Sequence, residues 1–218
     1  MSTRQSFDLQ LMDLQQHILR MASLVERAIY DAVESLTRQD TVLAQKVIDS
    51  DDAIDEFLND IEHTIIKIIA TQQPIARDLR VAITGLKIII SLERMADFAV
   101  DIAKITLRLA GEKLIKPLVK INEMARLAQQ MVKEGLDAYV QSDVTKARRM
   151  CGYDDDVDYY FHEVFEELIV FMKNEPRCIE QASHLLLVCR YLERIADYAT
   201  NIGEEVVYLI TGSMEDMN

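Results

Sequence analysis

The stretch Leu92–Ile102 reads LERMADFAVDI, and one hundred residues later Leu192–Ile202 reads LERIADYATNI. Because one pattern occurs twice at a fixed distance, the chain contains an internal duplication. Each copy places a Glu and an Asp four residues apart, so on a helix the two side chains fall on one face. The pattern therefore predicts a repeated helical architecture with stacked acidic side chains.

The composition favours a globular, acidic, helical chain. Half of the 218 residues are hydrophobic, and only six are Gly and three are Pro, which favours long helices and short loops. The formal net charge of −13 disfavours binding to nucleic acid and direct docking on anionic lipid. A charge of this sign is compatible with cations or with basic protein partners.

The cysteines and the apolar runs predict a cytoplasmic protein. Cys151, Cys178 and Cys189 are too few and too scattered for a disulfide framework. The N-terminus, Met1–Asp8, lacks the apolar core of a signal peptide. Apolar runs such as Ile65–Ala70 are far shorter than the ~20 residues that span a bilayer. We therefore expect a soluble chain that reaches a membrane only through its partners.

Apolar residues recur at spacings of three and four, which predicts an all-α fold. We expect six long helices, at residues 6–38, 41–72, 75–110, 117–141, 144–173 and 177–211. Residues 21–55 align without a gap on residues 124–158, so each half repeats three helices. The sequence thus predicts two tandem three-helix bundles, with domains at residues 1–113 and 114–218. Asp40 and Asp143 are placed to cap the second and fifth helices.

Lines of polar side chains run along the third and sixth helices, opposite the apolar stripe. Their members, spaced by four residues, are Glu93, Asp97 and Asp101 in the first copy and Glu193, Asp197 and Asn201 in the second. Like charges at this spacing destabilise a helix by about 0.2–0.5 kcal/mol per pair. A hard cation would reverse the sign of that cost, since carboxylate and amide oxygens are its preferred ligands.

The middle helix of each repeat carries a second acidic pair, Asp51 with Asp55 and Asp154 with Asp158. A neighbouring helix could bring each pair towards the acidic line of its own repeat, which predicts one cation site per repeat. The residues leave a second interpretation open, in which these acids form a solvated face neutralised by arginines such as Arg94.

Catalytic signatures are absent from the sequence. The four histidines, at positions 17, 63, 162 and 184, form neither an H-x-x-x-H nor an E-x-x-H pattern. The chain also lacks a P-loop and a G-x-S-x-G motif. We therefore do not expect an enzyme. Two alternatives remain, a metalloenzyme built on a carboxylate bundle and a metal-free helical scaffold.

Three stretches together identify a family resemblance. They are QQPIARDLR at Gln72–Arg80, LERMAD at Leu92–Asp97, and the second motif running into GEEVVYLITG at Gly203–Gly212. With these residues the chain resembles the PhoU family, cytoplasmic accessory and regulatory proteins of the high-affinity phosphate ABC transporter. The resemblance implies two three-helix bundles side by side, and covers nearly the whole chain.

The resemblance also implies bound metal at E(D)-x-x-x-D motifs, as mononuclear or multinuclear sites. Carried over by position, the ligands are Asp51, Asp55, Glu93 and Asp97, then Asp154, Asp158, Glu193 and Asp197. Divalent or trivalent ions of Fe, Mn, Mg or Zn are the expected cofactors. The family often has His where this chain has Phe98 and Tyr198, which leaves all-oxygen coordination. Asp101 replaces a frequent Asn, which Asn201 keeps, so the first site carries one more negative charge.

In function, the resemblance implies a negative regulator of phosphate homeostasis. Such a protein lowers phosphate uptake and represses the phosphate-starvation response when phosphate is plentiful. The implied partners are the ATPase subunit of the transporter and a sensor histidine kinase, and a homodimer is expected. The second repeat shows Arg177–Glu180 where the first has the turn Ala76–Arg80, so a partner that contacts this turn would contact only the first repeat.

Overall fold

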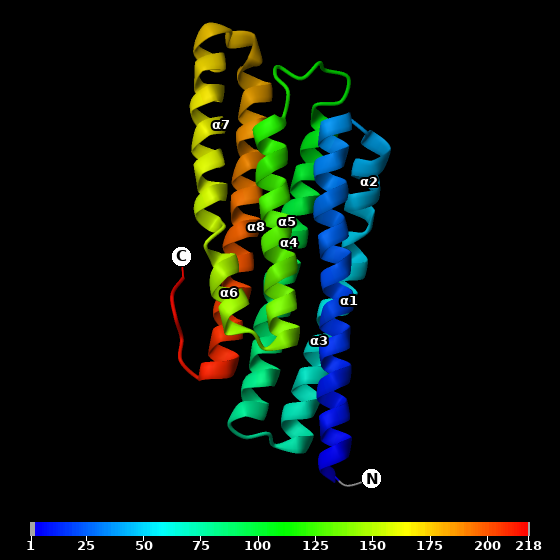
Figure 1. Cartoon of the computed structure of the whole chain (residues 1–218). Helices are drawn as coiled ribbons and strands as arrows, with labels where there is room; N and C mark the ends of the chain where they lie inside the picture. Colours follow the sequence, from blue (N-terminus) through cyan, green and yellow to red (C-terminus); the bar gives the residue numbers. More distant parts are fainter. Residues whose placement is uncertain (1–2, 218) are drawn as a thin grey trace.

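Long helices that follow one common direction make up most of residues 3–217, the part of the chain that the computed structural model describes (Figure 1). The helices are α1 (Thr3–Arg38), α2 (Thr41–Asp49), α3 (Asp51–Gln72), α4 (Arg77–Arg108), α5 (Val119–Gln141), α6 (Val144–Cys151), α7 (Asp154–Asn174) and α8 (Ile179–Thr211), with a 3₁₀ turn η1 (Pro176–Cys178) before α8. Residues 3–217 contain no strand, which confirms the all-α prediction. None of these helices combines the length and apolar character needed to cross a membrane.

The two repeats predicted from the duplication lie side by side, as the family resemblance implies (Figure 1). Helices α1 to α4 form the first bundle and α5 to α8 the second, and α4 and α8 run antiparallel between them (Figure 1). Lys87 of α4 donates to Glu205 of α8 at 2.6 Å, and the Phe98 ring stacks on Tyr191 at 5.7 Å. Buried side chains of both repeats form one continuous hydrophobic core. The domain boundary at 113/114 stays a prediction, and residues 1, 2 and 218 lie outside the described residues.

Two of the six predicted helices are interrupted. The helix predicted at 41–72 divides at Ser50 into α2 and α3, and the one predicted at 144–173 divides at Gly152 and Tyr153 into α6 and α7. The backbone stays right-handed at Ser50 (φ −85°, ψ −6°) and at Gly152 (φ −65°, ψ −10°). Because the helical spacing of apolar residues continues across each break, the sequence pattern does not reveal it.

Two aspartates cap helices at equivalent places, as predicted. Asp40 accepts hydrogen bonds of 3.0 and 2.9 Å from two backbone N–H groups at the start of α2, and Asp143 accepts one of 3.0 Å from the N–H of Lys146. The residues before them, Gln39 and Ser142, have left-handed backbones with φ of 53° and 52°. The chain therefore reverses by the same turn in both repeats.

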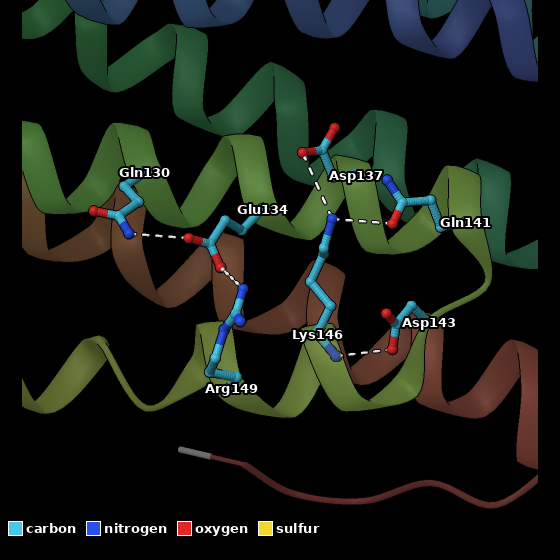
Figure 2. Close-up of polar contacts among 7 residues, drawn as sticks. All are labelled: Gln130, Glu134, Asp137, Gln141, Asp143, Lys146 and Arg149. Atoms are coloured by element: carbon cyan, nitrogen blue, oxygen red, sulfur yellow. Dashed lines mark hydrogen bonds and ion pairs between the residues drawn. The ribbon is translucent and has the colours of Figure 1, made fainter.

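Side-chain contacts fix α6 against α5 in the second repeat (Figure 2). Glu134 of α5 accepts hydrogen bonds from Arg149 of α6 and from Gln130, both at 2.9 Å. Lys146 of α6 lies 3.8 Å from Asp137 of α5. These contacts tie the short α6 to its neighbour and so set where α7 begins.

The predicted core stripe of the third helix is buried throughout. Its members are Ile88, Leu92, Met95, Ala99, Ile102, Thr106 and Leu109, each at most 3% exposed. In the second repeat, the equivalent helix α8 packs closely against α6 at Gly203. A Cβ atom added at Gly203 would lie 2.6 Å from Cys151 Sγ and 2.9 Å from Met150 Cε. Glycine is therefore required where these helices meet.

The three cysteines are buried and unpaired, in agreement with the sequence. Burial raises the pKa of the Cys151 and Cys189 thiols to about 12. Both thiols therefore stay protonated near neutral pH and are unreactive core residues.

The Gly203→Ala substitution should lower the free energy of unfolding by up to about 2 kcal/mol. The overpacked methyl group costs about 1–3 kcal/mol, and the better helix propensity of Ala offsets about 1 kcal/mol of this. Urea denaturation followed by circular dichroism measures the change. Gly152→Ala is the matched control, because Gly152 is exposed and its added Cβ would meet no atom closer than 3.4 Å. A stabilised Gly203→Ala protein would contradict the close packing of α8 on α6.

Candidate functional site

Four carboxylates from α3 and α4 form a first acidic cluster, Asp51, Asp55, Glu93 and Asp97. Burial is the main cause of the raised pKa of Asp51, followed by the charges of Asp55 and Asp97. Burial also raises the pKa of Glu93, with further increases from Asp97, Asp55 and Asp51. Acids on two helices thus lie within electrostatic range of one another, as the sequence predicts.

A second acidic cluster consists of the equivalent residues Asp154, Asp158, Glu193 and Asp197 on α7 and α8. Burial, with the charges of Asp158 and Asp197, raises the pKa of Asp154 to about 6. The Oδ1 atom of Asp154 is buried and has no hydrogen-bond partner. Burial likewise raises the pKa of Glu193 and of Asp197. This cluster therefore holds more negative charge than its surroundings satisfy.

The breaks in the middle helices place one acid of each cluster at a helix N-terminus. Asp51 is the first residue of α3, and Asp154 is the first residue of α7. The N-terminus of a helix carries partial positive charge and unpaired N–H groups, so acids are favoured there. Each break thus creates a helix N-terminus beside the carboxylates of the adjacent long helix.

Arginines pair with the carboxylates of α4 and α8. Arg94 lies 3.4 Å from Glu93 and 3.1 Å from Asp97. On α8, Arg194 donates to Asp197 at 3.1 Å, and Arg190 pairs with Glu193. A neutralising role was predicted from the sequence for arginines such as Arg94, but Arg190 was not among the predicted residues. Its spacing of three residues from Glu193 was the available signal.

These arginines compensate the clusters only in part, as a comparison with Glu134 shows. Burial raises the pKa of Glu134, yet hydrogen bonds from Gln130 and Arg149 outweigh it and leave this pKa below its ordinary value. Glu193 also pairs with an arginine, but its pKa stays raised. Burial is the largest cause of the raised pKa of Glu193, and the charges of Asp197 and Asp158 raise it further, since like charges penalise ionisation.

Two predicted ligands lie at the margin of the clusters. Asp101 pairs with Lys104 at 3.1 Å and faces Tyr191 of α8 closely enough to raise the pKa of that tyrosine, though burial is the larger cause. Asn201 is half-buried one turn beyond Asp197 on α8. Neither residue is among the groups whose charges act on the cluster acids.

The donor chemistry of the clusters fits a hard cation, although the carboxylates are not arranged as ligands. Within residues 3–217, no group of three or more His, Cys, Asp or Glu side chains has the arrangement of a metal site. Instead, Glu93, Asp97, Glu193 and Asp197 are each paired with an arginine. Carboxylate oxygens suit Mg²⁺, Mn²⁺ or iron, and the unpartnered Oδ1 atom of Asp154 lacks a positive neighbour.

A groove of about 630 Å³ lies between α1 and α5, on helices that contribute to neither cluster. Its lining is polar and charged and includes Glu26, Arg27, Arg126 and Lys133. Burial raises the pKa of Glu26, while Lys133 partly offsets the increase. Among the described residues, no cysteine or histidine lines this groove, and Glu26 is the one carboxylate in its lining.

Comparison with known families accounts for the duplication. The family model described as PhoU domain matches this chain twice, at residues 18–106 and 121–206. The chain belongs to the PhoU family. Each match contains one complete acidic cluster, so this PhoU protein carries the same set of acids in both family domains.

Relatives of this PhoU protein are similar over their whole length. A phosphate-specific transport system accessory protein PhoU homolog from Clostridium acetobutylicum is 44% identical, with 99% of each chain covered. A protein of the same name from Aquifex aeolicus is 40% identical, covering 94% of this chain and 93% of the relative. These names describe accessory proteins and not enzymes.

Two solved structures have the same fold as this PhoU chain. The crystal structure of PhoU from Pseudomonas aeruginosa has a TM-score of 0.92 and 36% identity, covering 95% of this chain and 100% of that chain. The phosphate transport system regulatory protein PhoU from Streptococcus pneumoniae has a TM-score of 0.90 and 32% identity, covering 96% and 99%. The arrangement of two bundles is therefore that of the family.

The Asp154→Asn substitution should stabilise the chelator-treated protein at pH 7 by about 1 kcal/mol, after allowance for solvent screening. The pKa of Asp154 is raised in the folded state to about 6, so ionisation at pH 7 opposes folding. The gain should shrink as the pH falls from 7 to 4, because Asp154 becomes protonated in the folded state, and it should vanish only below the ordinary pKa of 3.8. Thermal unfolding between pH 4 and pH 7 measures the change.

Asp156→Asn provides the control for Asp154→Asn. Asp156 is also in the first turn of α7, but it is exposed and is not among the charges that act on Asp154. A stability gain for Asp154→Asn that is equal at pH 4 and pH 7 would contradict the electrostatic explanation.

Proposed function

We propose that this chain is a non-enzymatic, cytoplasmic regulator of phosphate transport whose two acidic clusters bind cations. The observation that carries the proposal is the PhoU domain match in both repeats, each match with a full cluster. Relatives over the whole chain are named accessory proteins of the phosphate-specific transport system. The regulator would act on that system by protein contacts, with the transporter ATPase and a sensor histidine kinase as partners and with a homodimer as the active form.

The direction of regulation in this proposal is negative, so the protein lowers phosphate uptake when phosphate is plentiful. A bound cation would supply positive charge to carboxylates that now repel one another. In the first cluster, Asp51 and Asp55 of α3 and Glu93 and Asp97 of α4 would hold it. Since these acids come from two helices, their shared cation would link α3 to α4. The second cluster would link α7 to α8 in the same way.

Metal content tests the cation-binding part of the proposal. The parent protein, purified without chelator and incubated with Mg²⁺, Mn²⁺, Fe²⁺ or Zn²⁺, should retain metal in elemental analysis. The combined variant Glu93→Gln, Asp97→Asn, Glu193→Gln and Asp197→Asn should lose at least about nine-tenths of it, because each cluster loses two anionic ligands. Circular dichroism should remain helical.

Four exposed carboxylates outside the clusters provide a matched control for charge. The control variant is Asp60→Asn, Glu62→Gln, Glu166→Gln and Glu180→Gln. It removes the same number of negative charges and should retain metal like the parent. Equal metal loss in both variants, or a metal-free parent, would contradict site-specific binding and favour the scaffold alternative.

Uptake in cells tests the regulatory part of the proposal. Deleting the gene in its native host should raise uptake of labelled phosphate and expression of phosphate-starvation genes in phosphate-rich medium. The parent gene should restore both to their original levels. The cluster variant should restore them incompletely if cation binding is required for regulation. Unchanged uptake and gene expression after deletion would exclude a negative regulator.

A further inference from the structure

The ion pairs of the two clusters differ between the repeats. In the first cluster, one guanidinium, that of Arg94, serves both Glu93 and Asp97, with separations of 3.4 and 3.1 Å. Lys104, the next cation along α4, is held by Asp101 at 3.1 Å. Lys104 still lowers the pKa of Asp51 through its charge, but among the described residues Arg94 is the one basic side chain paired directly with carboxylates of this cluster.

The second cluster has two arginines for the same number of carboxylates. Arg194 donates to Asp197 at 3.1 Å, and Arg190 pairs with Glu193. At the position equivalent to Arg190 the first repeat has Ile90, an exposed apolar residue. The repeats have therefore kept their acids but differ in the number of basic side chains that neutralise them.

A cation would compete with these arginines for the same carboxylates. Each ion pair already occupies one carboxylate oxygen, Oε2 of Glu93 and Glu193 and Oδ2 of Asp97 and Asp197. A released Arg194 has an aromatic neighbour. Arg194 already lies 5.7 Å from the centre of the Tyr198 ring, and Phe98 lies 6.1 Å from that ring. An arginine over such a ring is favourable by about 0.5–1 kcal/mol at an exposed site.

We propose that Arg94, Arg190 and Arg194 are built-in counterions that compete with the cation, and that Arg190 makes the second cluster the weaker of the two cation sites. This inference rests on the proposed function, because it takes the clusters as cation sites. Cation binding then exposes guanidinium groups beside the Phe98 and Tyr198 rings, on the seam between the repeats. Cation binding would thereby change a surface of neutralised carboxylates into one that presents arginines and aromatic rings.

Single-site proteins allow each affinity to be measured. The Glu93→Gln, Asp97→Asn protein retains only the second cluster, and the Glu193→Gln, Asp197→Asn protein retains only the first. Titration with Mn²⁺ by calorimetry should give tighter binding to the first cluster. Adding Arg190→Gln to the protein with the second cluster should tighten Mn²⁺ binding about threefold to fivefold, the factor expected from a partly exposed ion pair.

Arg126→Gln is the matched control in the same single-site protein. Arg126 pairs with Glu123 at 2.9 Å over the same three-residue spacing, is similarly exposed, and lies on α5 outside both clusters. It should leave Mn²⁺ affinity unchanged. Titration with Mg²⁺ should also shift the side-chain Nε–H resonances of Arg190 and Arg194, but not that of Arg126, in NMR spectra of the unmutated protein.

The outcomes separate this inference from the proposed function. Tighter binding in Arg190→Gln with released arginine resonances supports competition. Unchanged or weaker binding in Arg190→Gln overturns it, since the arginine would then position the carboxylates, while cation binding itself would stand. If no protein of the set takes up Mn²⁺, both the inference and the cation-binding part of the proposed function fail.

Discussion

Antiparallel packing of α4 on α8 is the constraint on which the rest of the structure depends. Each of these helices has three different neighbours, namely the core of its own repeat, the helix of the other repeat, and the acids of its middle helix. The contact between them combines the stacking of Phe98 on Tyr191 with the ion pair of Lys87 and Glu205. Because one helix serves all three surfaces, a shift that improved one contact would disturb the other two.

The acidic clusters lie where α4 and α8 meet their middle helices, and gathering carboxylates there has an electrostatic cost. The fold reduces this cost in two ways. The breaks at Ser50 and Gly152 put a helix N-terminus beside each cluster, where the helix dipole favours negative charge. Arginines on α4 and α8 neutralise part of what is left. The buried, unpartnered Oδ1 atom of Asp154 shows that compensation is incomplete, and this is one reason for proposing a cation at the second cluster.

The repeats share the acids of the clusters but differ at charged and polar positions beside them. All eight acids are kept. In contrast, Arg190 of the second repeat aligns with Ile90 of the first, and Asn201 aligns with Asp101. Substitutions next to a charged site change its net charge without altering the packing of the core. If both clusters bind cations as proposed, the different counterions would let them respond to different cation concentrations.

The sequence by itself determined the helical class, the duplication, the core stripe of α4 and the acidic pairs, because all of these are local patterns with helical spacing. Only the tertiary structure decided that the acids of α3 and α4 approach one another, that Asp101 is held by Lys104, and that the middle helices break at Ser50 and Gly152. Distances between helices, and the charges that meet across them, depend on how separate segments pack, and the spacing of residues within one segment does not contain that information.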